Sequence, residues 1–579
     1  MRYFRYSLLI FLVSVLYMAK AQSSFPADYF RPPLDVPLYL SGTFGELRPN
    51  HFHAGIDIKT QGVEGLKVYA VADGYVSRIK VSLSGYGNAL YITHPNGYVS
   101  VYGHLKRFNN KINKYLREYQ YQRKSFTINL FPDKNLLKVK KGDIIAVSGN
   151  SGGSLGPHLH FEIRMADNQH PVNPLLFKSI KISDHRKPVI SSLIIYPVGD
   201  SSVVNDGCDT SYFKINGKNG DYHLPADTII RVYGNIAFGL RSYDLMDKIR
   251  NKNGIYQEQL WLDSTLVFDI QMKELSFYTS LYINSLIDYN FYQKKHLRVI
   301  RTQLDTNNKL AIYRTIENNG IFEFSDTLVH NLKYVVKDIY GNTSYLPFKL
   351  QGYHPDTVIR KKRVFPKDDS VYYVHYSRKT KLTLNGMSAD FPANAFYRSQ
   401  PIPFAKHNGN DETYSDFYTI GSRFIPLQKY CALSIRVNRK VSDSLKTKMF
   451  MAMIEDDGQK DFAGGNYKDE YINTKIRSLG TYAIYIDTIP PVIKPLNIRS
   501  DKKISSQKSL KFKIYDEFTG VKKYVGLLNN KWILMEYDPK KATLTYNFDW
   551  LLKKGKNSFK LYVFDNRDNR SVYKAVLYY

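Results

Sequence analysis

The chain has 579 residues, which at roughly 150 residues per domain predicts about four domains and excludes a single small module. Hydrophobic residues make up 43% and charged residues 23% of the chain, a composition that excludes a disordered tail and a membrane transporter. The formal net charge is +30, from 82 Lys and Arg against 52 Asp and Glu. Such a charge predicts an anionic partner or surface.

Residues 1–21 have the features of a secretory signal peptide. Arg2 and Arg5 precede an apolar run over 7–17, and Ala19-Lys20-Ala21 is a small-x-small cleavage site. The apolar run is far shorter than the roughly 20 residues that span a bilayer, which argues against an uncleaved anchor. We expect cleavage after Ala21 and export across the inner membrane, with no transmembrane segment in the mature chain.

The first domain, residues 22–180, is predicted to be mostly β. Short β-rich runs cover 66–71, 75–81, 89–93 and 98–102, and Asp-Gly and Asn-Gly turns join them, as in antiparallel meanders. A basic insertion over about 107–137 interrupts this rhythm. Within it, Ile112, Tyr115, Leu116 and Tyr119 have helical spacing, which predicts an amphipathic helix packed on the sheet, or alternatively a basic wall beside a cleft.

Three further β domains follow, over 184–352, 356–486 and 487–579. The segments 184–190 and 487–493 resemble each other, and so do 334–344 and 562–571, where an apolar strand leads to an Asp and a turn. We interpret the first and last of these domains as immunoglobulin-like β-sandwiches, the first enlarged by insertions. The region 356–486 is expected to be a β-sandwich of another type. Cys208 and Cys431 fall in different domains, so a disulfide framework is not expected, and the sequence leaves open whether they pair.

Histidines with informative neighbours gather in the first domain. His53 and Asp57 form H-x-x-x-D, His104 ends a predicted strand, and His158 and His160 form H-x-H in an alternating strand. Period-2 geometry places His158, His160 and Glu162 on one face of that strand, with the intervening residues in the core. Imidazole and carboxylate groups are suitable zinc ligands, and three of them plus water is the pattern of a catalytic site.

The order and spacing of several segments resemble the lysostaphin-type (LytM-like) zinc metallopeptidases over about residues 37–175. The matching pieces are 42–45, 53–57, 71–76, 102–105, 141–143, 149–152 and 156–162. The resemblance implies an antiparallel β-sheet peptidase domain with one Zn²⁺ bound by His53, Asp57 and His160. It implies catalytic, non-ligand roles for His104 and His158, while Glu162 is expected to support a ligand or to form a structural salt bridge.

The leading hypothesis is a secreted zinc endopeptidase that hydrolyses peptide cross-links of bacterial peptidoglycan, with the stem peptides as its partner. Two alternatives stay open: a catalytically silent regulator that recruits another wall hydrolase, and a peptidase of extracellular proteins. The β-sandwich domains are expected to contact envelope proteins. A nucleic-acid partner is not expected, because the export signal removes that target and no recognition motif accompanies the charge. The periplasm or cell envelope is the expected location.

Overall fold

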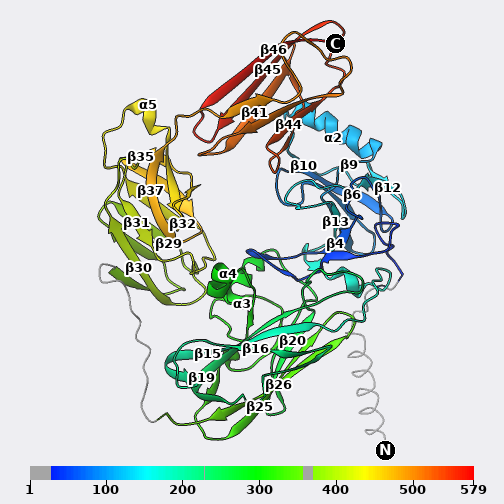
Figure 1. Ribbon diagram of the computed structural model, residues 1–579. Helices are drawn as coiled ribbons and strands as arrows, with labels where there is room; N and C mark the ends of the chain where they lie inside the picture. Colours follow the sequence, from blue (N-terminus) through cyan, green and yellow to red (C-terminus); the bar gives the residue numbers. More distant parts are fainter. Residues whose placement is uncertain (1–25, 27, 227, 356–369) are drawn as a thin grey trace, which may run out of the picture.

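The computed structural model describes residues 26, 28–226, 228–355 and 370–579. The predicted signal peptide lies outside the described residues. The protein is mostly β, as predicted, and Figure 1 shows four β-rich domains in chain order around a ring, so that the fourth domain returns to the first. In the part of the chain that is described, no helix has both the length and the apolar character needed to cross a bilayer.

The first domain is built on a nine-stranded sheet, whose main strand order is β1-β4-β13-β8-β7-β6-β10. Alternation places Leu159, Phe161 and Ile163 of β13 in the core, where each is fully buried. The predicted strands are confirmed in this domain. Its strands are β1 (Leu40–Gly42), β2 (Leu47–Arg48), β3 (His51–Phe52), β4 (Ile56–Lys59), β5 (Lys67–Tyr69), β6 (Gly74–Val81), β7 (Asn88–Thr93), β8 (Tyr98–Gly103), β9 (Arg107–Phe108), β10 (Ile128–Leu130), β11 (Lys138–Val139), β12 (Ile144–Val147), β13 (His158–Met165) and β14 (Pro171–Val172), followed by the 3-10 helix η1 (Pro174–Leu176).

The basic insertion contains the predicted helix, α2 (Asn110–Gln122). The Asn109 side chain caps it by accepting a hydrogen bond from the backbone N–H of Ile112 at 2.9 Å. Ile112 and Leu116 are buried in the domain core, and the helix therefore packs on the sheet as expected.

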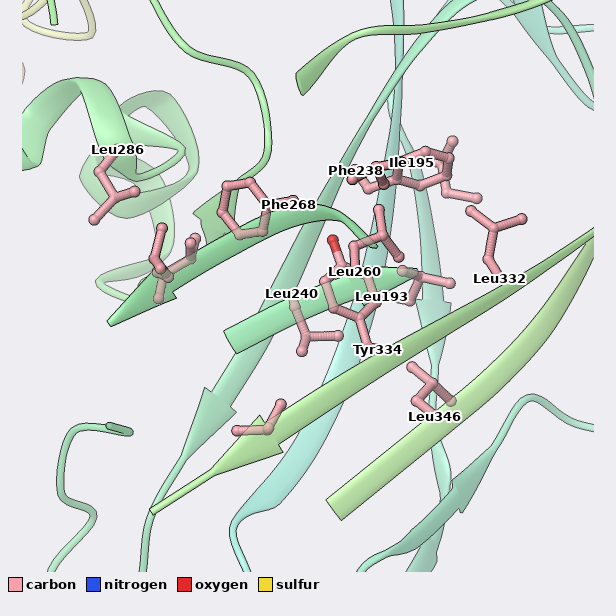
Figure 2. Packing of buried hydrophobic residues seen from close by; sticks show 14 of the residues in the cluster. Leu193, Ile195, Phe238, Leu240, Leu260, Phe268, Leu286, Leu332, Tyr334 and Leu346 are labelled. Atoms are coloured by element: carbon pink, nitrogen blue, oxygen red, sulfur yellow. The ribbon is translucent and has the colours of Figure 1, made fainter. Parts of the chain in front are cut away.

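The second domain, 184–352, joins its strands into one continuous twelve-stranded network, with main order β16-β15-β19-β26-β25-β20-β21-β23. The described residues of this domain do not form two separate facing sheets, so the immunoglobulin-like interpretation stays a prediction. Figure 2 shows the apolar residues that fill its core, among them Phe238, Leu260 and Tyr334. Its elements are β15 (Val189–Val204), β16 (Ser211–Lys214), β17 (Asn216–Lys218), β18 (Asp221–His223), β19 (Ile230–Tyr243), β20 (Gln257–Leu262), β21 (Thr265–Gln271), η2 (Ser280–Tyr282), α3 (Ile283–Leu286), α4 (Tyr289–Lys295), β22 (Ile300–Arg301), β23 (Tyr313–Ile316), η3 (Glu317–Gly320), β24 (Phe322–Phe324), β25 (Val329–Lys337) and β26 (Thr343–Gly352).

The third domain consists of a six-stranded and a five-stranded antiparallel sheet that share one apolar core. Residues 356–369, at the start of the predicted third domain, lie outside the described residues. The elements are β27 (Ser370–Val374), β28 (Thr380–Leu384), β29 (Met387–Phe391), β30 (Gln400–His407), β31 (Phe417–Ile420), β32 (Cys431–Arg436), α5 (Asp443–Lys446), β33 (Met449–Ile454), β34 (Lys460–Phe462), β35 (Asn466–Lys468), β36 (Tyr471–Ile476) and β37 (Gly480–Ile486).

The fourth domain has a four-stranded and a five-stranded sheet. Phe512 of one sheet stacks on Phe559 of the other, with ring centroids 5.3 Å apart, so the two sheets enclose a common core. The strands are β38 (Val492–Pro495), β39 (Lys502–Lys503), β40 (Ser509–Tyr515), β41 (Val521–Leu528), β42 (Lys531–Ile533), β43 (Glu536–Asp538), β44 (Thr543–Asn547), β45 (Lys556–Asp565) and β46 (Arg570–Tyr578).

The first two domains exchange apolar side chains across their boundary. Phe44 and Phe52 of the first domain belong to the core of the second. Met246 and Ile249 of the second domain belong to the core of the first. Because each domain fills part of the other's core, this boundary is a packed interface rather than a flexible linker.

Candidate active site

Three adjacent strands bring the predicted site residues together. β13 lies between β4 and β8, and its His160 is opposite Asp57 of β4 on one side and Gly103 of β8 on the other. His104 follows β8 directly, and His53 lies between β3 and β4. The backbone of His104 has a positive φ of 57°, which turns the chain sharply at the strand end.

The ligand atoms of His53, Asp57 and His160 form a tight triangle. His53 Nε2 lies 3.1 Å from Asp57 Oδ1 and 3.0 Å from His160 Nδ1, and His160 Nδ1 lies 2.9 Å from Asp57 Oδ1. Tetrahedral ligands at zinc bond lengths of about 2.0–2.1 Å stand roughly 3.3 Å apart. The donor set and its spacing therefore fit a zinc ion with small adjustments, and all three side chains are buried.

Hydrogen bonds fix which nitrogen of each imidazole is available to a metal. His53 donates from Nδ1 to the carbonyl of Thr43 at 2.7 Å, which leaves Nε2 for the metal. His160 donates from Nε2 to Glu162 at 2.7 Å, which leaves Nδ1. Glu162 in turn accepts from Arg164 at 2.5 Å, so it has the supporting position expected for it.

The charge balance of the site depends on its carboxylates. Burial opposes a charge on His160, but hydrogen bonds to Asp57 and Glu162 outweigh it and raise the pKa of His160 to about 9. Burial also opposes the charge of Asp57, yet the surrounding histidines hold its pKa well below the usual range. In the absence of a metal the site thus holds a proton on His160, which a metal ion would have to displace.

His104 and His158 face the same space, with ring centroids 4.7 Å apart. His104 donates from Nδ1 to the carbonyl of Ser151 at 2.8 Å, and His158 Nδ1 lies 2.9 Å from the carbonyl of Gly156. Both rings therefore turn Nε2 into the site as an acceptor. His158 Nε2 is buried without a hydrogen-bond partner among the described residues and lies 3.4 Å from Asp57 Oδ1.

The environment of His104 keeps its imidazole neutral. Burial is the largest cause, and the neighbouring His160 and His158 add to it, so the pKa of His104 falls to about 3. A neutral ring can accept a hydrogen bond from a water or hydroxide held in the site.

Sequence reasoning did not identify two residues beside the site. Arg48 donates to Asp57 Oδ2 at 2.6 Å, which leaves Oδ1 facing the two imidazoles. The ring of Tyr86 stacks on that of His160, with centroids 4.8 Å apart. Arg48 lies in a two-residue strand with no motif around it, but Tyr86 sits in a Gly-Tyr-Gly turn at a strand end, which is a usable signal.

Elements from other domains hold both sides of the site. On one side, Thr43 Oγ1 accepts from the backbone N–H of Gly254 in the second domain at 2.9 Å. On the other, Lys540 of the fourth domain donates to the carbonyl of Ser154 at 2.9 Å and to that of Asn150. The segment 149–156 therefore borders the site and contacts the fourth domain.

Comparison with known proteins gives two matches to protein families. Residues 51–121 and 134–174 match "Peptidase family M23", and residues 371–487 match "Zu5-like domain". The gap in the first match coincides with the end of the basic insertion. The second match covers the third domain, which the sequence predicted only as a β-sandwich of uncertain type.

Curated relatives match only part of the chain. An "Uncharacterized metalloprotease" of Haemophilus influenzae is 34% identical over 138 residues, which is 23% of this chain and 22% of the relative. The "DD-carboxypeptidase/endopeptidase Mpg" of Neisseria meningitidis is 34% identical over 123 residues, 21% of this chain and 22% of the relative. The "Murein hydrolase activator NlpD" of Salmonella typhimurium is 36% identical over 123 residues, 21% of this chain and 25% of the relative. The chain thus matches about a fifth to a quarter of the length of these relatives.

Among solved structures, the catalytic domain of lysostaphin from Staphylococcus simulans is 24% identical, with 23% of this chain and 86% of that chain covered and a TM-score of 0.18. The family match spans the strands that carry all five site residues. Residues 51–174 therefore form a domain of peptidase family M23, the lysostaphin-type metallopeptidases.

Proposed function

We propose that the protein is a zinc-dependent endopeptidase that cleaves peptide cross-links of peptidoglycan in the cell envelope. The observation that carries the proposal is the buried triangle of His53, Asp57 and His160 with two further imidazoles turned toward it. A structural zinc site has four protein ligands, whereas three candidate ligands meet here among the described residues, the number expected for a catalytic site.

The residues that would hold the metal are His53, Asp57 and His160, and a bound Zn²⁺ would polarise a scissile carbonyl and activate a water. His158 Nε2 lies 3.4 Å from Asp57 Oδ1 and is suited to take a proton from that water. His104 remains neutral and orients the water through Nε2. Arg48 holds Asp57 in place.

The substrate class is supported by the family of the first domain and by the charge of the chain. The relative from Neisseria meningitidis is described as a DD-carboxypeptidase/endopeptidase. A formal net charge of +30 favours a polymer that carries carboxylates, and peptidoglycan stem peptides do so. The expected signal peptide would deliver the protein to the envelope.

The test is digestion of purified sacculi by the zinc-loaded protein, with mass spectrometry of the released muropeptides. We expect the wild type and His170→Ala to release the same products, because His170 pairs with Glu274 away from the site. His160→Ala should release none. Equal release by His160→Ala would overturn the proposed mechanism, and the masses of the products identify the bond that is cleaved.

A second candidate is a regulator that binds peptidoglycan or another hydrolase without cleaving. One of the matched relatives is described as a murein hydrolase activator. The two candidates differ in metal content: stoichiometric zinc together with muropeptide release favours the peptidase, and absence of both favours the regulator. Digestion of a glycine-rich protein beside the sacculi tests the remaining alternative, a peptidase of extracellular proteins.

A further inference from the structure

Three aspartate side chains meet at the junction between the first and second domains. Asp184 begins the second domain, Asp244 follows β19 and Asp338 follows β25. One carboxylate oxygen of each lies within 4.8 Å of the others. Their exposed fractions are 8%, 2% and 3%, so this junction cluster (Asp184, Asp244 and Asp338) is more than nine-tenths buried.

Two carboxylates of the junction cluster each have one oxygen that the described residues do not satisfy. Asp184 Oδ2 and Asp244 Oδ1 are buried and have no hydrogen-bond partner among the described residues. The backbone of Asn253 pairs with that of Asp244 through two hydrogen bonds of 2.9 Å. The side-chain amide of Asn253 is also buried, and neither its nitrogen nor its oxygen has a hydrogen-bond partner among the described residues. Buried carboxylate oxygens normally have a hydrogen bond or a cation, because an unpaired buried charge is costly.

The nearby positive side chain does not neutralise the junction cluster. Arg186 donates to the carbonyls of Met246 and Ile249 at 3.5 and 3.2 Å. No ion pair joins it to the three aspartates in the described part of the chain. As a result, burial and the neighbouring carboxylates raise the pKa of Asp244 to about 8.

A similar cluster of three aspartates lies in the fourth domain, where hydrogen bonds from the chain satisfy the carboxylates. Asp487, Asp516 and Asp565 also have ligand atoms within 4.8 Å of one another. There, Asp487 accepts from Thr519 Oγ1 at 2.7 Å, and Asp516 Oδ1 accepts three backbone N–H groups. In the junction cluster, Asp338 also accepts hydrogen bonds, from Tyr340 and Asn342. The two clusters therefore differ at Asp184 Oδ2 and Asp244 Oδ1, which lack such a donor among the described residues.

We propose that Asp184, Asp244 and Asp338 bind one calcium ion that fastens the second domain to the first. Carboxylate oxygens from three separate segments suit Ca²⁺, which takes six to eight oxygen ligands in irregular geometry. Mg²⁺ is less suited, because it requires near-octahedral geometry and retains several waters. Asn253 and water would complete the ligand set.

The position of the junction cluster indicates what the ion would do. The loop that follows Asp244 carries Met246 and Ile249 into the first domain's core. Asn253, the backbone partner of Asp244, precedes Gly254, which donates to Thr43 Oγ1. The carbonyl of Thr43 orients His53. A bound ion would therefore order the loop on which one side of the proposed zinc site rests.

Calcium binding is tested on the full mature chain, loaded with one equivalent of zinc in calcium-free buffer, by calorimetric titration with Ca²⁺ or Mg²⁺. We expect one Ca²⁺ per chain in the wild type and in the control Asp263→Asn, an exposed residue of the same domain that pairs with His330. Asp244→Asn should bind at least 100-fold more weakly. Saturating Ca²⁺ should raise the melting temperature of the wild type by about 5 °C or more and that of Asp244→Asn not at all.

Melting without calcium distinguishes an ion site from a purely structural role of Asp244. Without calcium, Asp244→Asn should melt at the same temperature as the wild type or higher, because it removes one of three crowded carboxylates. With saturating calcium, the wild type should melt at the higher temperature. Absence of binding at 10 mM Ca²⁺ would overturn the proposal, because this concentration is roughly ten times the dissociation constant of the weakest extracellular calcium sites. Three other results would also overturn it: Asp244→Asn binds Ca²⁺ as tightly as the wild type, the wild type prefers Mg²⁺, or Asp516→Asn loses the bound ion while Asp244→Asn keeps it. These measurements do not depend on peptidase activity, so they stand or fall separately from the proposed function.

Discussion

The proton held by His160 should make the metal-free first domain sensitive to alkaline pH. The pKa of this group is raised to about 9 in the folded chain, against an ordinary value of 6.5. A raised pKa means that the folded state binds a proton more tightly than the unfolded state. The resulting stabilisation is complete below pH 6.5 and is lost as the pH rises toward 9.

The size of this effect follows from the two pKa values. Each pH unit over which the folded state alone holds the proton contributes roughly 1.4 kcal/mol, so the interval from 6.5 to about 9 corresponds to about 3 kcal/mol. His160 is buried, so solvent screening does not reduce this figure substantially. In His160→Gln no group titrates at this position, and the contribution should be absent.

The assay is hydrogen exchange at the backbone amides of β8 and β13, measured between pH 6 and 9.5 in the presence of a chelator. We expect the opening free energy of the wild type, relative to His160→Gln, to fall by about 3 kcal/mol across that range. The variant corrects for other groups that titrate in the same interval. Parallel curves for the two proteins would refute the assignment of the proton to His160.

Three other outcomes are expected. His104→Ala and His158→Ala should keep one zinc per chain but lose 10²–10⁴-fold in the rate of muropeptide release, in line with the loss of a positioned proton-transfer group. Burial raises the pKa of Glu258 to about 8, so the wild type should lose stability as the pH rises from 4.5 to 8. In a series of melting curves over that interval, Glu258→Gln should therefore gain stability relative to the wild type. Tyr121→Ala should increase the radius of gyration in solution scattering, because Tyr121 joins α2 to Trp532 and Trp550 of the fourth domain; an unchanged radius would mean that other contacts hold the ring closed.

Part of the candidate site could be predicted from the sequence, because that part of its geometry is local. In H-x-H the period of a strand places His158 and His160 on one face, and Asp57 needs only a neighbouring strand in register. His53 and His104 were candidates from their neighbouring residues, and the family resemblance added their expected roles, because the positions of both side chains depend on turns. Side chains that reach the site from elsewhere, such as Arg48, have no periodic signal and were not predicted.

The remaining domains were less predictable because long-range pairing decides their form. Two similar segments, 184–190 and 487–493, suggested two similar sandwiches, yet the strands of the second domain join into one network while those of the fourth form two sheets. The contact of α2 with the fourth domain spans more than 400 positions, at Tyr121 and Asp549, and no local pattern encodes it.

The contacts between domains would give the accessory domains a physical role in the proposed catalysis. The His53 side of the site rests on Thr43 and Gly254, and thus on the second domain. The His104 side rests on the loop over 149–156, which the fourth domain holds through Lys540. The side chains on the two sides must keep their relative positions to within about 0.5 Å for a productive site. A closed ring of four domains can therefore set the spacing between the proposed ligands and the proposed catalytic histidines. The accessory domains are then part of the proposed catalytic apparatus, and removing the fourth would affect the site even though it supplies no ligand.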